Sequence, residues 1–167
     1  MGGSGARERP GTKKAPLLFR GINPLSLDNK GRLSMPAKYR QRLLEAGDGQ
    51  VILTIDRDRC LLLYPLTVWE DVERKLIQLS STNKRARALK RLLLGHAEEC
   101  CLDAGGRILL PAPLREFANL EKQVVLVGQG NKFEIWNEQA WRAWRESLLA
   151  GEGDEGESLP DLDSLAF

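Results

Sequence analysis

Two short segments of the chain combine an aspartate, a glycine and an arginine at the same spacing. The first is Asp28-Asn29-Lys30-Gly31-Arg32, and the second is Asp103-Ala104-Gly105-Gly106-Arg107. An aspartate at the start of a tight turn can accept hydrogen bonds from backbone N–H groups that follow it, and glycine readily adopts positive φ. The spacing therefore predicts one turn built on Asp28 and Gly31 and a second built on Asp103 and Gly106, each ending in an arginine.

The arginine at the end of each turn has two candidate roles. A guanidinium group can donate two parallel hydrogen bonds to O6 and N7 of guanine, so Arg32 and Arg107 are candidates for contact with DNA bases. The alternative is that each arginine pairs with its own aspartate, Asp28 or Asp103, and holds the turn. A single motif leaves the two roles evenly balanced.

The other residues that could do chemistry do not form a catalytic or metal-binding set. His96 is the only histidine, and no neighbouring serine or cysteine gives it the pairing typical of nucleophilic catalysis. Glu98 and Glu99 are adjacent, so their side chains do not converge as an acid/base pair. Cys100 and Cys101 lack the C-x-x-C spacing of structural zinc sites. We therefore expect a protein that is not an enzyme and needs no cofactor or metal.

The length and composition of the chain are typical of a folded cytoplasmic protein. Its 167 residues, 42% of them hydrophobic, suffice for one compact domain or two small fused units. No apolar run approaches the roughly 20 residues of a membrane helix, and the first residues lack the apolar core of a signal peptide. Three cysteines are too few and too oddly placed for a disulfide framework, so we expect reduced, mostly buried thiols.

The net charge is only +2, but the charges are unevenly distributed along the chain. Residues 1–20 contain five basic residues and one acid, whereas residues 151–167 contain six acids and no base. Both ends are rich in glycine and cannot bury enough apolar surface to offset the entropy lost on ordering. We predict disordered ends on either side of a basic folded part.

The two arginine turns belong to a repeat that organises most of the chain. Residues 28–40 and 103–115 share Asp, Gly, Arg, Pro, Ala and a closing Arg at matching positions. The similarity continues through the apolar runs at 51–54 and 124–127 and reaches Trp69 and Trp141. Self-similarity of this extent indicates two copies of one unit of roughly 60 residues.

Each copy predicts the same order of elements: strand, tight turn, strand, short helix, hairpin and longer helix. Pro36 and Pro111 suit the first turn of the short helix, where a missing N–H is harmless. After the short helix, each copy has two apolar runs rich in β-forming residues. Residues 56–59 and 128–131 lie between these runs and suit hairpin turns.

Capping signals mark the longer helices. Thr67 and Glu70 have the spacing of a capping box for the helix of the first copy, and Asn137 can cap the equivalent helix of the second. Between the copies, residues 83–94 read as a basic amphipathic helix that Gly95 ends. We expect the basic side chains of this connecting helix to form a solvated face, with direct DNA contact and packing at a subunit boundary as the alternatives.

The paired Asp-x-x-Gly-Arg motifs make the sequence similar to the MraZ family of bacterial regulators, which is related to the AbrB group. The resemblance extends from Phe19-Arg20-Gly21 to about Ser147. It implies an α+β fold in which two tandem AbrB-like units form a pseudo-two-fold swapped-hairpin β-barrel with flanking helices, and it implies assembly into homo-oligomeric rings. The expected organisation is an extension or tag at 1–17, a first AbrB-like unit at 18–80, a connecting basic helix at 81–97, a second unit at 98–149 and an acidic tail at 150–167.

The resemblance also implies a sequence-specific regulator of the cell-division and cell-wall gene cluster, a repressor that binds repeated double-stranded DNA elements of the promoter at the nucleoid. Together with the duplicated motif, it favours DNA contact over the ion-pair role for the two turn arginines. Lys30 of the first turn is replaced by Gly105 in the second, so we expect the first turn to be the stronger DNA contact. The expected DNA-binding residues are Arg32, Lys30, Arg107, Lys38, Arg40 and Arg115.

The alternative is a protein of another class, an antitoxin-like module that acts through its acidic C-terminal tail. In that tail Leu159, Leu162, Leu165 and Phe167 are set among acids, a composition that can fold on a basic groove of a partner. A regulator should keep DNA binding when residues 151–167 are removed, whereas a protein that depends on the tail should lose its complex.

Overall fold

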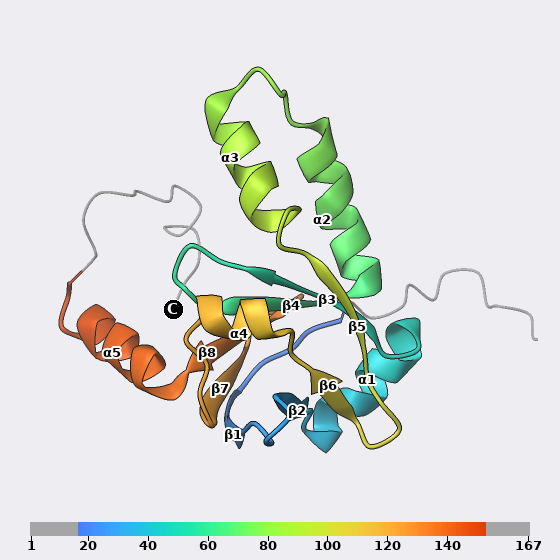
Figure 1. The fold of residues 1–167 in the computed structure, drawn as a ribbon, viewed down its shortest axis with the longest axis vertical. Coiled ribbons are helices and arrows are strands. Elements are labelled where there is room, and N and C mark those ends of the chain that lie inside the picture. Colours follow the sequence, from blue (N-terminus) through green and yellow to red (C-terminus); the bar gives the residue numbers. More distant parts are fainter. Residues whose placement is uncertain (1–16, 153–167) are drawn as a thin grey trace, which may run out of the picture.

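The computed structural model describes residues 17–152, and the predictions for the ends at 1–16 and 153–167 lie outside this range. The described residues form an α+β fold, as predicted, and the order of two strands, helix, two strands and helix occurs twice, with one helix between the copies (Figure 1). In chain order the elements are β1 (Ile22–Ser26), β2 (Arg32–Ser34), α1 (Ala37–Gly47), β3 (Gln50–Ile55), β4 (Leu61–Pro65), α2 (Leu66–Gln78), α3 (Lys84–Leu93), β5 (Glu98–Cys101), β6 (Arg107–Leu109), α4 (Ala112–Phe117), β7 (Gln123–Gly128), β8 (Phe133–Asn137) and α5 (Glu138–Leu149).

Strands of the two copies are interleaved. Six strands form an antiparallel sheet in the order β1-β7-β8-β4-β3-β5, and β2 and β6 form a separate two-stranded ribbon. In the sheet, β1 of the first copy pairs with β7 of the second, and β5 of the second copy pairs with β3 of the first. Each copy therefore completes the sheet of the other. The pairings within residues 17–152 leave β1 and β5 as open edges, so the expected closed barrel is not confirmed.

The central strands are buried on both faces, which explains their continuous apolar runs. The main core contains side chains such as Leu53, Leu63, Leu126 and Ile135, all with 0% exposure. On the other face, Trp69 of α2 packs with residues of β3 and β4, and Trp141 of α5 packs with residues of β7 and β8. The two longer helices thus cover equivalent positions in the two copies.

The helix starts agree with the sequence in part. Asn137 caps α5, since its side-chain oxygen accepts a hydrogen bond from the Ala140 N–H at 3.0 Å, as predicted. The capping box predicted at Thr67 is wrong, because α2 begins directly after Pro65 and has no side-chain cap hydrogen bond. Thr67 consequently lies inside the first turn, past the position from which a hydroxyl caps a helix.

Helices α2 and α3 form a hairpin that projects away from the sheet at the top of Figure 1. Asn83 caps α3 by accepting a hydrogen bond from the Ala86 N–H at 3.1 Å, and Ala86 is the buried residue of this helix. At the other end, the Thr54 hydroxyl on β3 donates a hydrogen bond to the Leu93 carbonyl at 2.7 Å. The basic helix is therefore anchored to the sheet at its C-terminal end. None of the helices of residues 17–152 is long and apolar enough to cross a bilayer.

The three cysteines are free thiols in different environments. Cys60 is buried, Cys100 is half-buried and Cys101 is exposed. The expectation of mostly buried thiols is therefore wrong for Cys101, which lies at the end of the edge strand β5.

Candidate nucleic-acid interface

The β2–β6 ribbon brings the arginines of the two turns onto one face. In its antiparallel register Arg32 is opposite Leu109, Leu33 is opposite Ile108, and Ser34 is opposite Arg107. Leu33 and Ile108 are fully buried at 0% exposure. Because side chains alternate along a strand, both arginines lie on the outer face of the ribbon, beside Leu109, which is 57% exposed.

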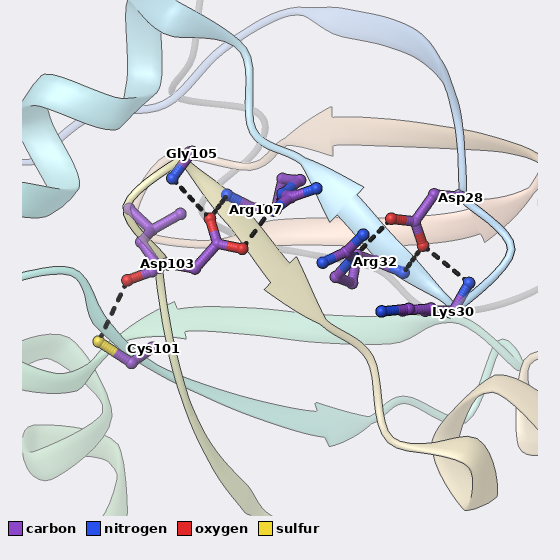
Figure 2. A network of polar contacts seen from close by, with 8 residues as sticks. Asp28, Lys30, Arg32, Cys101, Asp103, Gly105 and Arg107 are labelled. Carbon is purple, nitrogen blue, oxygen red and sulfur yellow. Dashed lines mark hydrogen bonds and ion pairs between the residues drawn. The ribbon is translucent and has the colours of Figure 1, made fainter.

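The first turn is held by the carboxylate of Asp28. Its Oδ1 atom accepts hydrogen bonds from the N–H groups of Lys30 at 3.0 Å and Arg32 at 2.8 Å, and Oδ2 accepts one from Arg32 Nε at 2.6 Å (Figure 2). Gly31 takes φ of +82° in this turn. These hydrogen bonds, chiefly the one from the Arg32 N–H, lower the pKa of Asp28 below its ordinary value because they stabilise the charged carboxylate.

The second turn reproduces the first. Oδ1 of Asp103 accepts hydrogen bonds from the N–H groups of Gly105 and Arg107, both at 2.9 Å, and Oδ2 accepts one from Arg107 Nε at 3.1 Å (Figure 2). Gly106 takes φ of +74°. Backbone hydrogen bonding, first from the Arg107 N–H, again lowers the pKa of Asp103. The sequence repeat is thus also a repeat of hydrogen bonds.

Each turn arginine pairs with its own aspartate, as the ion-pair alternative expects, but the pair occupies only one edge of the guanidinium. The contact uses Nε in both cases, with 26% of the Arg32 side chain and 38% of the Arg107 side chain exposed. Within residues 17–152, the Nη atoms of these two arginines make no hydrogen bond. The aspartate therefore fixes the direction of the guanidinium and leaves its terminal amino groups able to bind a further acceptor.

The closing arginine of each motif packs against the turn of the opposite copy: Arg40 lies against the second turn and Arg115 against the first. Arg40 Nε donates a hydrogen bond to the Met35 carbonyl at 2.6 Å, and Arg115 Nε donates one to the Leu110 carbonyl at 3.0 Å. Arg115 packs against the first turn so closely that a Cβ at Gly31 would lie 2.6 Å from its Cζ, and a Cβ at Gly106 would overlap Arg40 in the same way.

Backbone hydrogen bonds join the same two turns to the opposite copy. The Met35 N–H donates to the Gly106 carbonyl at 2.9 Å, and the Leu110 N–H donates to the Gly31 carbonyl at 3.0 Å. The sequence analysis placed Arg40 among the DNA-binding residues and missed its packing under the opposite turn. The only indication of this packing in the sequence was that both motifs end with an arginine at the same position.

The two lysines of the expected DNA-binding set occupy different places. Lys30 is exposed in the first turn, next to Arg32, whereas the second turn has Gly105 at the matching position. Lys38 is exposed on α1, where its Nζ lies 4.9 Å from the centre of the Tyr39 ring. The structure thus brings Lys30 together with the ribbon arginine and places Lys38 on the adjoining helix.

A cluster that the sequence did not indicate lies between the β3–β4 turn and β8. Ligand atoms of Asp56, Cys60 and Glu134 lie within 4.8 Å of one another. Gln129 Nε2 and Trp136 Nε1 donate hydrogen bonds to Glu134 Oε1 at 3.0 and 3.2 Å. Burial raises the pKa of both the Cys60 thiol and the Glu134 carboxyl. A metal would therefore have to displace the thiol proton from a buried site.

Comparison with known proteins agrees with the repeated architecture. A family model described as "MraZ protein, putative antitoxin-like" matches residues 18–92 and again residues 93–154. The chain is 52% identical over 152 residues to Transcriptional regulator MraZ of Methylococcus capsulatus, which covers 90% of this chain and 100% of the relative. It is 54% identical to the protein of the same name from Halorhodospira halophila over 152 residues, again 90% and 100% of the two chains. The protein of that name from Shewanella oneidensis is 54% identical over 150 residues, 89% of this chain and 97% of the relative.

Proposed function

The chain belongs to the MraZ family, and on this premise we propose that it is a transcriptional regulator that binds double-stranded DNA through the outer face of the β2–β6 ribbon. The observation that carries the proposal is that Arg32 and Arg107 share this face while their terminal amino groups stay free within the described residues. The DNA major groove, about 12 Å wide, admits a two-stranded ribbon. The similar proteins are named transcriptional regulators, and that name describes a non-enzymatic activity.

The ion pairs prepare the arginines for this task. An unconstrained arginine loses side-chain entropy when it binds a base, whereas Arg32 and Arg107 are already oriented by Asp28 and Asp103. The Nη groups can then donate to guanine O6 and N7, the acceptors that distinguish guanine in the major groove.

Phosphate contacts supply the affinity in this proposal. Lys30 and Lys38 are exposed and suit phosphate oxygens, and the turn with Lys30 is the stronger of the two. Arg40 and Arg115 position the turns through Nε, and their Nη groups contact the DNA backbone from the base of the ribbon.

The interleaved strands also support a wider proposal for the assembly. The units at 18–80 and 98–149, joined by the connecting helix at 81–97, form a pseudo-two-fold swapped-hairpin barrel. Several copies close into a homo-oligomeric ring at the nucleoid in the cytoplasm. Because tethering raises the effective concentration of each further ribbon, a ring binds repeated promoter elements tightly although each ribbon binds weakly. Bound in this way ahead of the cell-division and cell-wall genes, the protein acts as a repressor.

The test is a fluorescence-anisotropy titration of DNA from upstream of the protein's own gene, at two salt concentrations. We expect salt-sensitive binding by the wild type and a loss of affinity of about fivefold to 150-fold in Arg32→Ala, since one bidentate base contact contributes about 1–3 kcal/mol. Arg74→Ala is the matched control, because Arg74 also pairs with a nearby aspartate, Asp71, but lies on α2.

Two results would contradict the proposal. If Arg32→Ala bound as tightly as Arg74→Ala, the ribbon would not be the DNA surface. If the wild type bound no DNA at low salt, the chain would fit the antitoxin-like class instead.

A further inference from the structure

An apolar groove opens between α3, the turn that joins β3 to β4, and α4. Its volume is about 380 Å³, within the range of roughly 300–1,000 Å³ typical of binding sites. Figure 1 shows how these three segments meet at the base of the projecting helical hairpin. The apolar wall of the groove consists of Ile55, Leu89, Leu92, Leu93 and Phe117.

Two arginines line the groove beside this apolar wall. Arg57 and Arg59 are exposed, and within the described part of the chain neither forms an ion pair. Arg59 has φ of +64°, and its Cζ lies 5.1 Å from the centre of the Phe117 ring. The one acid in the lining is Asp56, whose Oδ2 atom accepts a hydrogen bond from the Asp58 N–H within the turn.

Helix α3 lines the groove with the apolar residues Leu89, Leu92 and Leu93. Its five basic residues over Lys84–Leu93 are not among the lining residues, so the charge of the groove comes from the β3–β4 turn. The Leu92 side chain is 36% exposed at the groove. The surface therefore suits a ligand that combines apolar side chains with carboxylates.

The chain itself contains a segment of this composition at residues 153–167. The segment has five acids and no base, and Leu159, Leu162, Leu165 and Phe167 are its large apolar residues. The three leucines are three positions apart, a spacing that puts side chains on one side of a helical turn. Fifteen residues span up to about 50 Å, whereas a domain of this size has a radius of gyration of about 15 Å. The segment can therefore reach the groove from Glu152.

We propose that residues 153–167 dock intramolecularly in the groove, with leucine side chains against Leu92 and Phe117 and carboxylates beside Arg57 and Arg59. Attachment to the same chain gives the segment an effective concentration on the order of millimolar. An intrinsic affinity in that range is enough to keep the groove occupied about half of the time. Docking covers exposed apolar surface and brings carboxylates to two arginines that form no ion pair within the described residues.

The experiment uses the full chain with a photo-crosslinking amino acid in place of Leu162. A mixture of isotope-labelled and unlabelled protein is irradiated without DNA, and the crosslinked peptides are mapped by mass spectrometry. We expect crosslinks within one chain to residues 89–93 or to Phe117. The double substitution Arg57→Glu with Arg59→Glu should reduce their yield at least fivefold, whereas Arg145→Glu on α5 is the matched control and should leave it unchanged.

A charge exchange makes the test independent of any folding defect in the groove variant. Adding Asp161→Lys and Asp163→Lys to the double groove variant should restore the crosslinks. Three outcomes would overturn the proposal: crosslinks elsewhere on the chain, crosslinks only between labelled and unlabelled chains, or a crosslink yield that does not change with the charge exchange. Crosslinks only between labelled and unlabelled chains would assign the groove to the segment of a neighbouring copy. Because no DNA is present, none of them bears on the ribbon.

Discussion

The close packing of Arg115 under the first turn leads to a prediction that separates two costs of replacing glycine. Gly31 has φ of +82°, and a Cβ there would lie 2.6 Å from Arg115 Cζ. Gly130 has φ of +81° with nothing within 4 Å of a Cβ, and Gly47 has neither positive φ nor a neighbour within that distance. Alanine at Gly31 therefore tests backbone strain together with a clash, and alanine at Gly130 tests backbone strain alone. Alanine at Gly47 introduces neither.

The expected magnitudes follow from these surroundings. Left-handed backbone costs a residue with a Cβ about 1–2 kcal/mol, so Gly130→Ala should lower the free energy of unfolding by that amount. Gly31→Ala adds displacement of Arg115, whose hydrogen bond to the Leu110 carbonyl contributes about 1.5–3 kcal/mol, for a total of about 2.5–5 kcal/mol. Gly47→Ala, at the end of α1, should be neutral or stabilise the protein by up to about 1 kcal/mol.

The assay is urea unfolding followed by tryptophan fluorescence at one fixed protein concentration, since oligomers make apparent stability depend on concentration. A double-mutant cycle with Arg115→Ala isolates the clash, because Gly31→Ala should cost less once the guanidinium is gone. The reasoning is refuted if Gly31→Ala destabilises the protein no more than Gly130→Ala, or if the cycle is additive.

Three further predictions concern the turns, the thiols and the helix caps. Hydrogen bonds lower the pKa of Asp28 in the folded state, so its charge contributes stability above the unfolded pKa of about 3.9, and this contribution is lost as the pH falls through the lowered value. Asp28→Asn should therefore flatten the acid limb of a curve of unfolding free energy against pH. An unchanged acid limb would contradict the assignment. Iodoacetamide at pH 8 should modify the exposed Cys101 well before the buried Cys60, whose pKa is raised by burial; mass spectrometry of the modified peptides would expose the opposite order. Asn137→Ala should lower the free energy of unfolding by about 1 kcal/mol through loss of the α5 cap, whereas Thr67→Ala, which removes no cap, should have a smaller effect in the same denaturation assay.

Features fixed by neighbours along the chain could be predicted from the sequence. The turn at Asp28 depends on a carboxylate, a glycine and backbone N–H groups within five residues, and the same residue types recur at Asp103. The cap at Asn137 is equally local, and the short continuous apolar runs rich in β-forming residues, bounded by turn residues, indicated the buried strands. The prediction at Thr67 failed because Pro65 starts the helix earlier, a boundary that propensity does not resolve.

The relation between the copies depended on contacts that no local pattern encodes. Pairing of β1 with β7 and of β2 with β6 joins residues 73 to 105 positions apart, so the repeat could indicate two units but not which strands they exchange. The pairing of β2 with β6 places Arg115 under the first turn and Arg40 under the second, and the pairing of β4 with β8 gathers Asp56, Cys60 and Glu134 from distant hairpins. The sequence by itself determined the two aspartate turns and the order of the elements, because hydrogen bonding and hydrophobic patterning act over a few residues. It left the aspartate–arginine ion pairs as one of two roles, and the structure showed that they form. Only the tertiary structure decided that both arginines share one face, because that requires the strand register between the copies.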